Sequence, residues 1–442
     1  MSPRLDPVAT DDRLPPRADV VIVGGGIIGV STALFLARRR VSVVLCEKGS
    51  IAAEQSSRNW GWVRKMGRDP RELPLIIESL ALWGDMNELV AGETGFRRTG
   101  TLYLCRSEAE VARRAAWLEH ARLYQLDSRV IGAAEIERLA PGSAERWAGA
   151  VFTASDGRAE PQKAAPAIAA AARRLGAVVL TGCAVRGIET AAGRVAAAVT
   201  ERGRIACDAV VLAGGAWSRL FCGSLGLTLP QLHVLASVMR TEPVPGGPDL
   251  CASAPGFAFR RRLDGGYTVA NNTVHVADIV PDGFRFFFDF LPVLRLERKA
   301  LRLRLGRRFL DQLLTPRRWA LDRPSPFETV RVLDPAPTGW ALDAAEAALA
   351  ESFPVFRGVK RAESWAGLID ATPDTVPVIS PVDRLPGFVI ASGFSGHGFG
   401  IGPAAGRLAA DLVTGDPPLV DPTPFRFSRF SDGTRPRPVT GV

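Results

Sequence analysis

Long apolar stretches, paired cysteines and histidines at metal-ligand spacing are all missing from this chain of 442 residues. No run of about 18 uncharged apolar residues occurs, so no transmembrane helix is predicted. The first 17 residues lack the basic-then-apolar order of a signal peptide, which favours a cytoplasmic protein. The six cysteines are scattered and form no Cys-x-x-Cys pair, so we expect buried free thiols and neither disulfides nor a metal site.

Internal repeats, low-complexity blocks and a basic module interleaved with aromatic residues are also absent, which argues against nucleic acid as a partner. The formal net charge of +9 is carried mostly by arginine. Such a surface can steer anionic substrates or meet acidic lipids, or it can reflect composition alone. The hydrophobic fraction of 47% is ample for a large core and for two domains.

A glycine-rich turn follows a short β-branched run near the start of the chain. Residues 20–23 read Val-Val-Ile-Val, as expected for a parallel strand that is buried on both faces. Gly24 permits a tight turn, Gly26 lets the backbone approach a phosphate, and Gly29 lets a helix pack closely on the strand. The first N–H groups and the dipole of that helix would face the same point. The pattern predicts a site for the pyrophosphate of a dinucleotide.

An acidic residue, Glu47, ends the second predicted strand, residues 41–46. It lies about 20 residues past the glycines, where a carboxylate accepts hydrogen bonds from a ribose 2′-hydroxyl. Because the same carboxylate would repel a 2′-phosphate, the unit favours FAD or NAD over NADP.

Two later strands also end in glycine-rich segments. Residues 207–213 lead into Gly214 and Gly215, and residues 388–392 lead into five glycines within 393–402 and a helix over 403–414. The N–H groups of the last segment can form an anion-binding concavity, which suits the negative charge of a reduced flavin ring. Three such segments at strand ends favour one long cofactor.

Helical and hairpin patterns fill the rest of the chain. They predict helices over 75–90, 108–123 and 161–175, strands over 98–105 and 177–181, and hairpins over 184–200 and 257–271. We therefore expect an α/β nucleotide-binding domain that is discontinuous in sequence, with a second domain inserted twice. The predicted FAD-binding domain comprises 17–92, 150–231 and 362–416, the substrate-binding domain 93–149 and 232–361, and a C-terminal tail 417–442.

The chain resembles the D-amino-acid oxidase, glycine oxidase and sarcosine oxidase superfamily of FAD enzymes, the DAO type. Beyond the first fingerprint, the resemblance rests on residues 56–61, 213–218, 365–374 and 393–399, the last reading Gly-Phe-Ser-Gly-His-Gly-Phe. It implies a Rossmann-like FAD-binding domain and an α+β substrate domain with an antiparallel sheet. It also implies oxidation of the C–N bond of an amino acid or amine by hydride transfer to flavin N5. The resulting imine would hydrolyse to an oxo-acid, with oxygen or a quinone as the electron acceptor.

The motifs and the resemblance together predict the site residues. We expect catalytic contacts from Arg58, Trp62, Arg260 and His397. We expect the cofactor to contact Gly24, Gly26, Ile27, Ile28, Gly29, Glu47, Lys48, Ser56, Ser57, Arg58, Asn59, Val185, Gly214, Gly215, Trp217, Gly393, Gly396, His397 and Gly398.

The chain departs from the family at three positions. An Arg that binds the substrate carboxylate in glycine oxidase is Ile369 here, a Lys of sarcosine oxidase is Gly400, and its flavin-linked Cys is Gly367. FAD is therefore expected to be non-covalent. A carboxylate in a dry pocket still needs a cation. Candidates are Arg58, Arg64 and residues 260–262, among which strand alternation and the turn favour Arg260.

Residues 55–63, together with Phe-Arg-Arg at 96–98, also resemble bacterial L-amino-acid deaminases. Two other hypotheses stay open: a flavoprotein subunit whose FAD is structural or relays electrons within a complex, and an NAD-linked dehydrogenase.

Residues 283–310 are basic and aromatic, and 294–309 could form one amphipathic helix. That helix could lie on a membrane, as a peripheral contact of an otherwise cytoplasmic protein, or it could cover the second domain.

Overall fold

The computed structural model describes residues 2–434 and 437–439. A six-stranded sheet forms its first layer, in the order β21-β22-β13-β1-β2-β9. The five strands from β22 to β9 run parallel, with Val20 of β1 paired to Val43 of β2 and to Ala209 of β13. Its strands are β1 (Val20–Val23), β2 (Val43–Cys46), β9 (Val178–Leu180), β13 (Ala209–Leu212), β21 (Val378–Pro381) and β22 (Phe388–Ser392).

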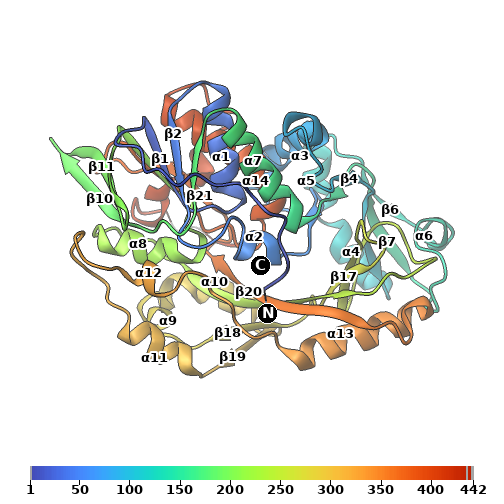
Figure 1. Ribbon diagram of the computed structural model, residues 1–442. Coiled ribbons are helices and arrows are strands. Elements are labelled where there is room, and N and C mark those ends of the chain that lie inside the picture. Colours follow the sequence, from blue (N-terminus) through green and yellow to red (C-terminus); the bar gives the residue numbers. More distant parts are fainter. Residues whose placement is uncertain (1, 435–436, 440–442) are drawn as a thin grey trace.

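Three helices pack side by side against this sheet (Figure 1). The central one is α1 (Ile27–Arg38), flanked by α7 (Pro161–Arg174) and α14 (Gly398–Thr414). Both α1 and α14 begin at glycine-rich turns that follow strands of the sheet, so their N-termini open at the same edge. α1 is buried along nearly its whole length, in keeping with its mostly apolar sequence.

A second, mostly antiparallel sheet runs in the order β19-β18-β14-β17-β16-β15-β5-β7-β6, with β20 also paired to β14. Helix α13 (Gly339–Ser352) covers one face of it, along the lower edge of Figure 1. Its strands are β5 (Thr101–Cys105), β6 (Ser128–Ile131), β7 (Gly149–Thr153), β14 (Leu232–Thr241), β15 (Cys251–Ala254), β16 (Phe257–Arg261), β17 (Tyr267–Ala270), β18 (His275–Asp278), β19 (Leu301–Arg304) and β20 (Arg361–Ala371).

Smaller elements complete the fold. Two three-stranded sheets contain β10 (Val185–Ala191), β11 (Arg194–Thr200) and β12 (Gly203–Ala206), and β3 (Trp62–Val63), β8 (Gly157–Arg158) and β4 (Arg97–Arg98). The remaining helices are α2 (Gln55–Arg58), α3 (Leu73–Leu89), α4 (Glu108–Ala115), α5 (Leu118–Leu123), α6 (Ala133–Leu139), α8 (Ser218–Ser224), α9 (Pro281–Arg285), α10 (Phe287–Glu297), α11 (Arg307–Leu314) and α12 (Pro326–Thr329).

The structure corrects three predicted elements. The helix expected over 294–309 is wrong: α10 ends at Glu297, β19 intervenes, and α11 begins at Arg307. Residues 108–123 form two short helices, and the strand expected over 98–105 is interrupted at Gly100, whose φ is +80°. A positive φ of this kind is compatible with glycine but breaks a regular strand.

The predicted domain division stays a prediction, although the two sheets follow it broadly. β7 and β20 belong to the antiparallel sheet while most of their residues fall in segments assigned to FAD binding. In the tail, Arg429 is buried and pairs with Asp374 at 3.1 Å. All six cysteines are buried and free. Within the described residues, no helix has the length and apolar character needed to cross a membrane.

Candidate functional site

A large cavity lies where the carboxyl ends of the parallel strands face the antiparallel sheet. Its volume is about 290 Å³. The Gly24–Gly26 turn, Gly214, Gly215 and residues 396–400 all contribute to its lining. All three predicted glycine segments therefore meet along one cavity, as a long cofactor requires.

The turn at Gly24 has no room for side chains. Gly24 has φ +110°, and a Cβ there would collide with the carbonyl oxygen of Ala213; a Cβ on Gly29 would collide with the carbonyl oxygen of Gly24. The backbone N–H of Ile27 in the first turn of α1 donates to Ser56 Oγ at 2.8 Å. Bare backbone, helix N–H groups and a hydroxyl thus surround the point predicted for the pyrophosphate, so these residues fit it.

Glu47 and Lys48 line the cavity next to this turn. The Glu47 carboxylate accepts the N–H of Gly25 at 2.7 Å and that of Gly49 at 2.6 Å. Burial raises the pKa of Glu47, and these two N–H groups oppose the increase. Each oxygen retains a lone pair for a ribose hydroxyl. Lys48 Nζ instead binds Glu54 at 3.1 Å and lies 4.1 Å above the ring of Trp217.

His397 also lines the cavity and pairs with Glu72, their Nδ1 and Oε2 atoms 2.9 Å apart. Burial lowers the pKa of His397, and the positive charge of Arg68 lowers it further, although Glu72 opposes both. The ring is then neutral at neutral pH, and Nδ1 carries the hydrogen that Glu72 accepts. Nε2 is left as an acceptor.

Asp370 is a cavity-lining carboxylate to which the sequence analysis assigned no role. It accepts the N–H of Gly393 at 2.8 Å and the amide of Gln231 at 3.2 Å. Burial raises its pKa to about 6, against the hydrogen bonds that favour the charged form.

Most predicted cofactor residues line the cavity. The exceptions are Gly29, Ser57 and Gly393, which lie directly behind the wall and hold its shape through Gly24, Glu54 and Asp370, respectively.

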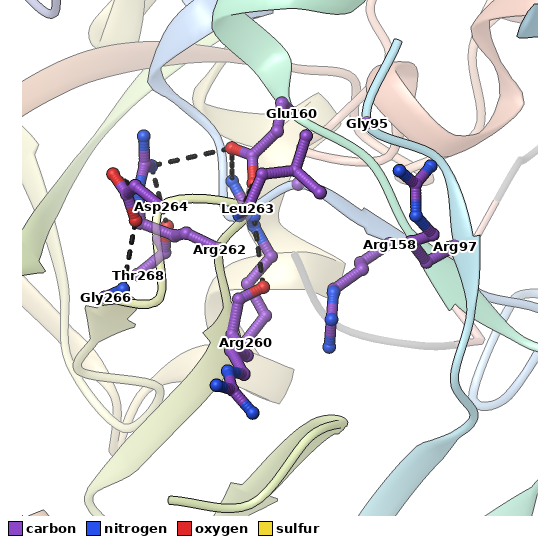
Figure 2. Close-up of polar contacts among 12 residues, drawn as sticks. Gly95, Arg97, Arg158, Glu160, Arg260, Arg262, Leu263, Asp264, Gly266 and Thr268 are labelled. Atoms are coloured by element: carbon purple, nitrogen blue, oxygen red, sulfur yellow. Dashed lines mark hydrogen bonds and ion pairs between the residues drawn. The ribbon is translucent and has the colours of Figure 1, made fainter. Parts of the chain in front are cut away.

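Arg260 requires a correction, because it does not line the cavity. Its guanidinium forms two hydrogen bonds with the carboxylate of Glu160, at 2.8 and 2.9 Å (Figure 2). Its Nε donates to the carbonyl of Trp60. Burial alone would raise the pKa of Glu160, but Arg260 and then Arg262 outweigh it and lower the pKa to about 2. Arg260 is buried, but its guanidinium points to Glu160, the residue that precedes α7, and not into the cavity as strand alternation and the turn predicted.

Arg58 lines the cavity, but its donors are also occupied. Nε binds the carbonyl of Ala53, Nη1 binds that of Ala366 and the carboxylate of Asp334, and Nη2 binds Ser2. Arg58 therefore ties surrounding segments together. Trp62, also predicted, does line the cavity, with Trp60 packed edge-on at 5.6 Å.

Two further cations in the wall are Arg64, which was among the carboxylate candidates, and Arg68, which sequence reasoning missed. Arg68 follows a glycine in a Met-Gly-Arg-Asp-Pro loop, where no periodicity indicates direction. Asn271 and His275 line the opposite wall, from β18 and the turn before it.

Comparison with known proteins agrees with this geometry. The family model of DAO, FAD dependent oxidoreductase, matches residues 19–412. The structure of L-amino acid deaminase from Proteus myxofaciens in complex with anthranilate is 37% identical, with a TM-score of 0.94 and coverage of 98% of this chain and 97% of that one. The enzyme of the same name from Proteus vulgaris is 34% identical, with a TM-score of 0.91 and coverage of 95% and 99%. Glycine oxidase from Pseudomonas putida is 28% identical and covers 92% of this chain and 97% of its own length.

These matches confirm the predicted fold class, the FAD cofactor and the enzyme class, oxidation of an amino-acid or amine C–N bond. The chain belongs to the DAO family of FAD-dependent oxidoreductases.

Proposed function

We propose that this enzyme is an L-amino-acid deaminase, which converts an L-α-amino acid to the corresponding imino acid, hydrolysed by water to an oxo-acid and ammonium. The observation that carries the proposal is the similarity to L-amino acid deaminases over nearly the full length of both chains. When bound, FAD accepts the hydride that leaves the α carbon.

The cavity walls support a substrate with an apolar side chain. Leu235 and Val238 from β14, Val276 from β18 and Ile369 from β20 line its antiparallel-sheet side. These four side chains receive hydrocarbon favourably, while Asn271 and His275 are polar groups of the same cavity.

The chain's own residues would bind, orient and shield the reactants. Trp60 and Trp62 cover one side of the chamber and limit the entry of water. The neutral ring of His397 presents Nε2 as an acceptor for an N–H group, held in that tautomer by Glu72. The departing proton of the amine needs an acceptor of this kind, because only the neutral amine releases a hydride readily.

The experiment is anaerobic titration of the yellow holoenzyme with L-, D- and N-methyl amino acids while the visible flavin band is recorded. We expect bleaching by L-amino acids with apolar side chains, and little by D-amino acids or glycine. Bleaching by N-methyl amino acids or glycine alone would favour a sarcosine or glycine oxidase. No bleaching by any compound would favour a subunit with structural or relaying FAD. Acid precipitation of the same sample should release the yellow colour, since Gly367 offers no thiol for a covalent link.

For the electron acceptor and location, we propose peripheral contact with an anionic membrane through residues 281–318, the basic segment. It contains ten Arg and Lys residues against four Asp and Glu residues. Helix α11 supports the proposal because two of its polar residues face inward: Arg308 binds His233 at 3.2 Å, and Gln312 accepts the N–H of Asp282 at 2.9 Å. Arg307 and Asp311 of the same helix are exposed and pair with each other.

The apolar face of α11 points outward instead. Leu310, Leu313 and Leu314 are 55%, 57% and 78% exposed, and Phe288 of α10 is 84% exposed. Basic residues around exposed apolar side chains are typical of interfacial helices. A quinone in the bilayer would then be the acceptor; oxygen is the alternative.

A further inference from the structure

The guanidinium of Arg68 is buried in the cavity wall and forms no ion pair with any residue that the structure describes. The residue is 3% exposed, Nε donates to the backbone carbonyl of Arg64 at 3.2 Å, and Nη1 is buried with no hydrogen-bond partner among the described residues. A buried charge in this condition costs several kcal/mol. It therefore marks a place where an anion from outside the chain would be stabilised.

Nearby carboxylates have other partners, although one oxygen is left without any. Asp69 binds Arg71 at 2.7 Å, and Asp156 accepts the N–H groups of Lys65 and Met66 at 2.8 and 3.3 Å. Glu72 binds His397 through Oε2, while its Oε1 is buried and has no hydrogen-bond partner among the described residues. Glu72 attracts Arg68 electrostatically, but burial and the like charge of Arg64 still lower the pKa of Arg68 to about 10. The guanidinium remains protonated at neutral pH, and its charge is incompletely balanced.

Arg68 lies close to Gly400 and Trp62 in the wall of the cavity. A Cβ built on Gly400 would lie 3.4 Å from Arg68 Nη2 and 3.3 Å from the carbonyl oxygen of Trp62. Gly400, Arg68, Arg64 and Trp62 all line the cavity. A methyl group at position 400 would therefore contact the guanidinium of Arg68, beside the loop that carries His397.

We propose that Arg68 binds the carboxylate of the substrate, with Arg64 as the second cation of the same wall. This inference rests on the proposed function, because it assigns the substrate's carboxylate to a place in the same cavity. Arg68 is suited to the task because a guanidinium presents parallel N–H groups that match both oxygens of a carboxylate. Arg64 Nη1 donates a hydrogen bond to the carbonyl of Met66, and Arg64 Cζ lies 5.8 Å from the centroid of the Tyr103 ring.

The test uses the FAD-loaded enzyme and two probes of similar shape. Anthranilate carries a carboxylate and an aromatic amine, whereas aniline carries only the amine. Each is titrated while the visible flavin spectrum is recorded, so no turnover is needed. We expect Arg68→Gln to weaken anthranilate binding by about 10- to 100-fold, the equivalent of one or two charged hydrogen bonds. Aniline binding should not change.

Three variants sharpen the result. Arg68→Lys keeps the charge but loses the paired N–H groups, so its anthranilate affinity should be intermediate. Gly400→Ala crowds Nη2 without a change of charge, and it should also weaken anthranilate. Arg113→Gln replaces an exposed arginine of α4 and serves as the matched control, with unchanged binding of both probes.

Unchanged anthranilate affinity in Arg68→Gln with FAD retained would overturn the proposal. Should that variant lose FAD, the Arg68→Lys and Gly400→Ala titrations decide, and unchanged affinity in both would overturn it equally. The outcome is separable from that of the proposed function. If no L-amino acid bleaches the flavin but anthranilate binding depends on Arg68, the deaminase assignment fails while the carboxylate site stands.

Discussion

Three buried arginines have different roles because different groups face their guanidiniums. Arg260 meets a carboxylate, and Arg58 meets carbonyl oxygens, a hydroxyl and Asp334, so both are structural. Arg68 meets no acceptor at Nη1 among the described residues and faces a cavity. Residue type and burial are the same in all three cases, and only the local balance of charge separates an anchor from a binding group.

Arg260→Met is expected to lower the free energy of unfolding by about 3–5 kcal/mol, because it leaves the carboxylate of Glu160 buried and unpaired. The double variant Arg260→Met/Glu160→Gln removes both charges and should recover much of that loss. Urea unfolding of the holoenzyme measures both effects. A single variant as stable as the parent, or a double variant less stable than the single one, would contradict the role of the pair.

The contact between α1 and α14 determines how the cofactor turn is held. Gly406 of α14 lies against α1, where an added Cβ would collide with the side chain of Ser31 and approach the Thr32 nitrogen to 2.7 Å. Because α1 begins directly after the Gly24–Gly26 turn, any shift of α1 and α14 moves the N–H groups predicted to face the pyrophosphate.

Gly406→Ala is expected to destabilise the protein by about 1–3 kcal/mol, the usual effect of overpacking a core. The affinity for FAD should fall together with the stability, because the backbone of α1 cannot move away from α14 without moving the Gly24–Gly26 turn. Gly339→Ala at the start of α13, where a Cβ meets nothing within 4 Å, is the matched control. Thermal unfolding and FAD release by fluorescence measure the two quantities. Equal behaviour of the two variants would show that the helix contact tolerates a methyl group.

Strand–turn–helix units were predictable from sequence because their determinants are local. The turn at Gly24, the acid at Glu47 and the glycines before α14 each lie within a few residues of the strand that presents them. The carboxylate site was not predictable in this way. Glu160 and Arg260 are 100 positions apart, and Arg68 lies in an irregular loop whose direction is set by packing against α14. A long-range ion pair decided the case of Arg260, whereas Arg68 has no such partner among the described residues and its loop carries no periodic pattern.

At the scale of the whole molecule, charge and exposed apolar area gather in the basic segment. Residues 281–318 carry a net charge of +6, from ten basic and four acidic side chains, within a total of +9. Figure 1 shows α9 and α11 together beneath the antiparallel sheet, beside β19. Only one side of α10 packs against the rest of the chain: Phe290 and Val293 are buried, while Phe287 and Phe288 are exposed. An interfacial partner explains the outward face of α11 better than a covering role within the chain.

The combined variant Leu310→Gln/Leu313→Gln/Leu314→Gln is expected to bind anionic vesicles at least about tenfold more weakly than the parent. Sedimentation with phosphatidylcholine vesicles, with and without phosphatidylglycerol, measures the binding. Salt should weaken it, because basic side chains attract anionic headgroups over about one Debye length. Leu123→Gln, which replaces a leucine 79% exposed on α5, is the control and should bind like the parent. A parent protein that ignores vesicles and forms a dimer that the triple variant dissociates would identify a second copy as the partner and refute the membrane proposal.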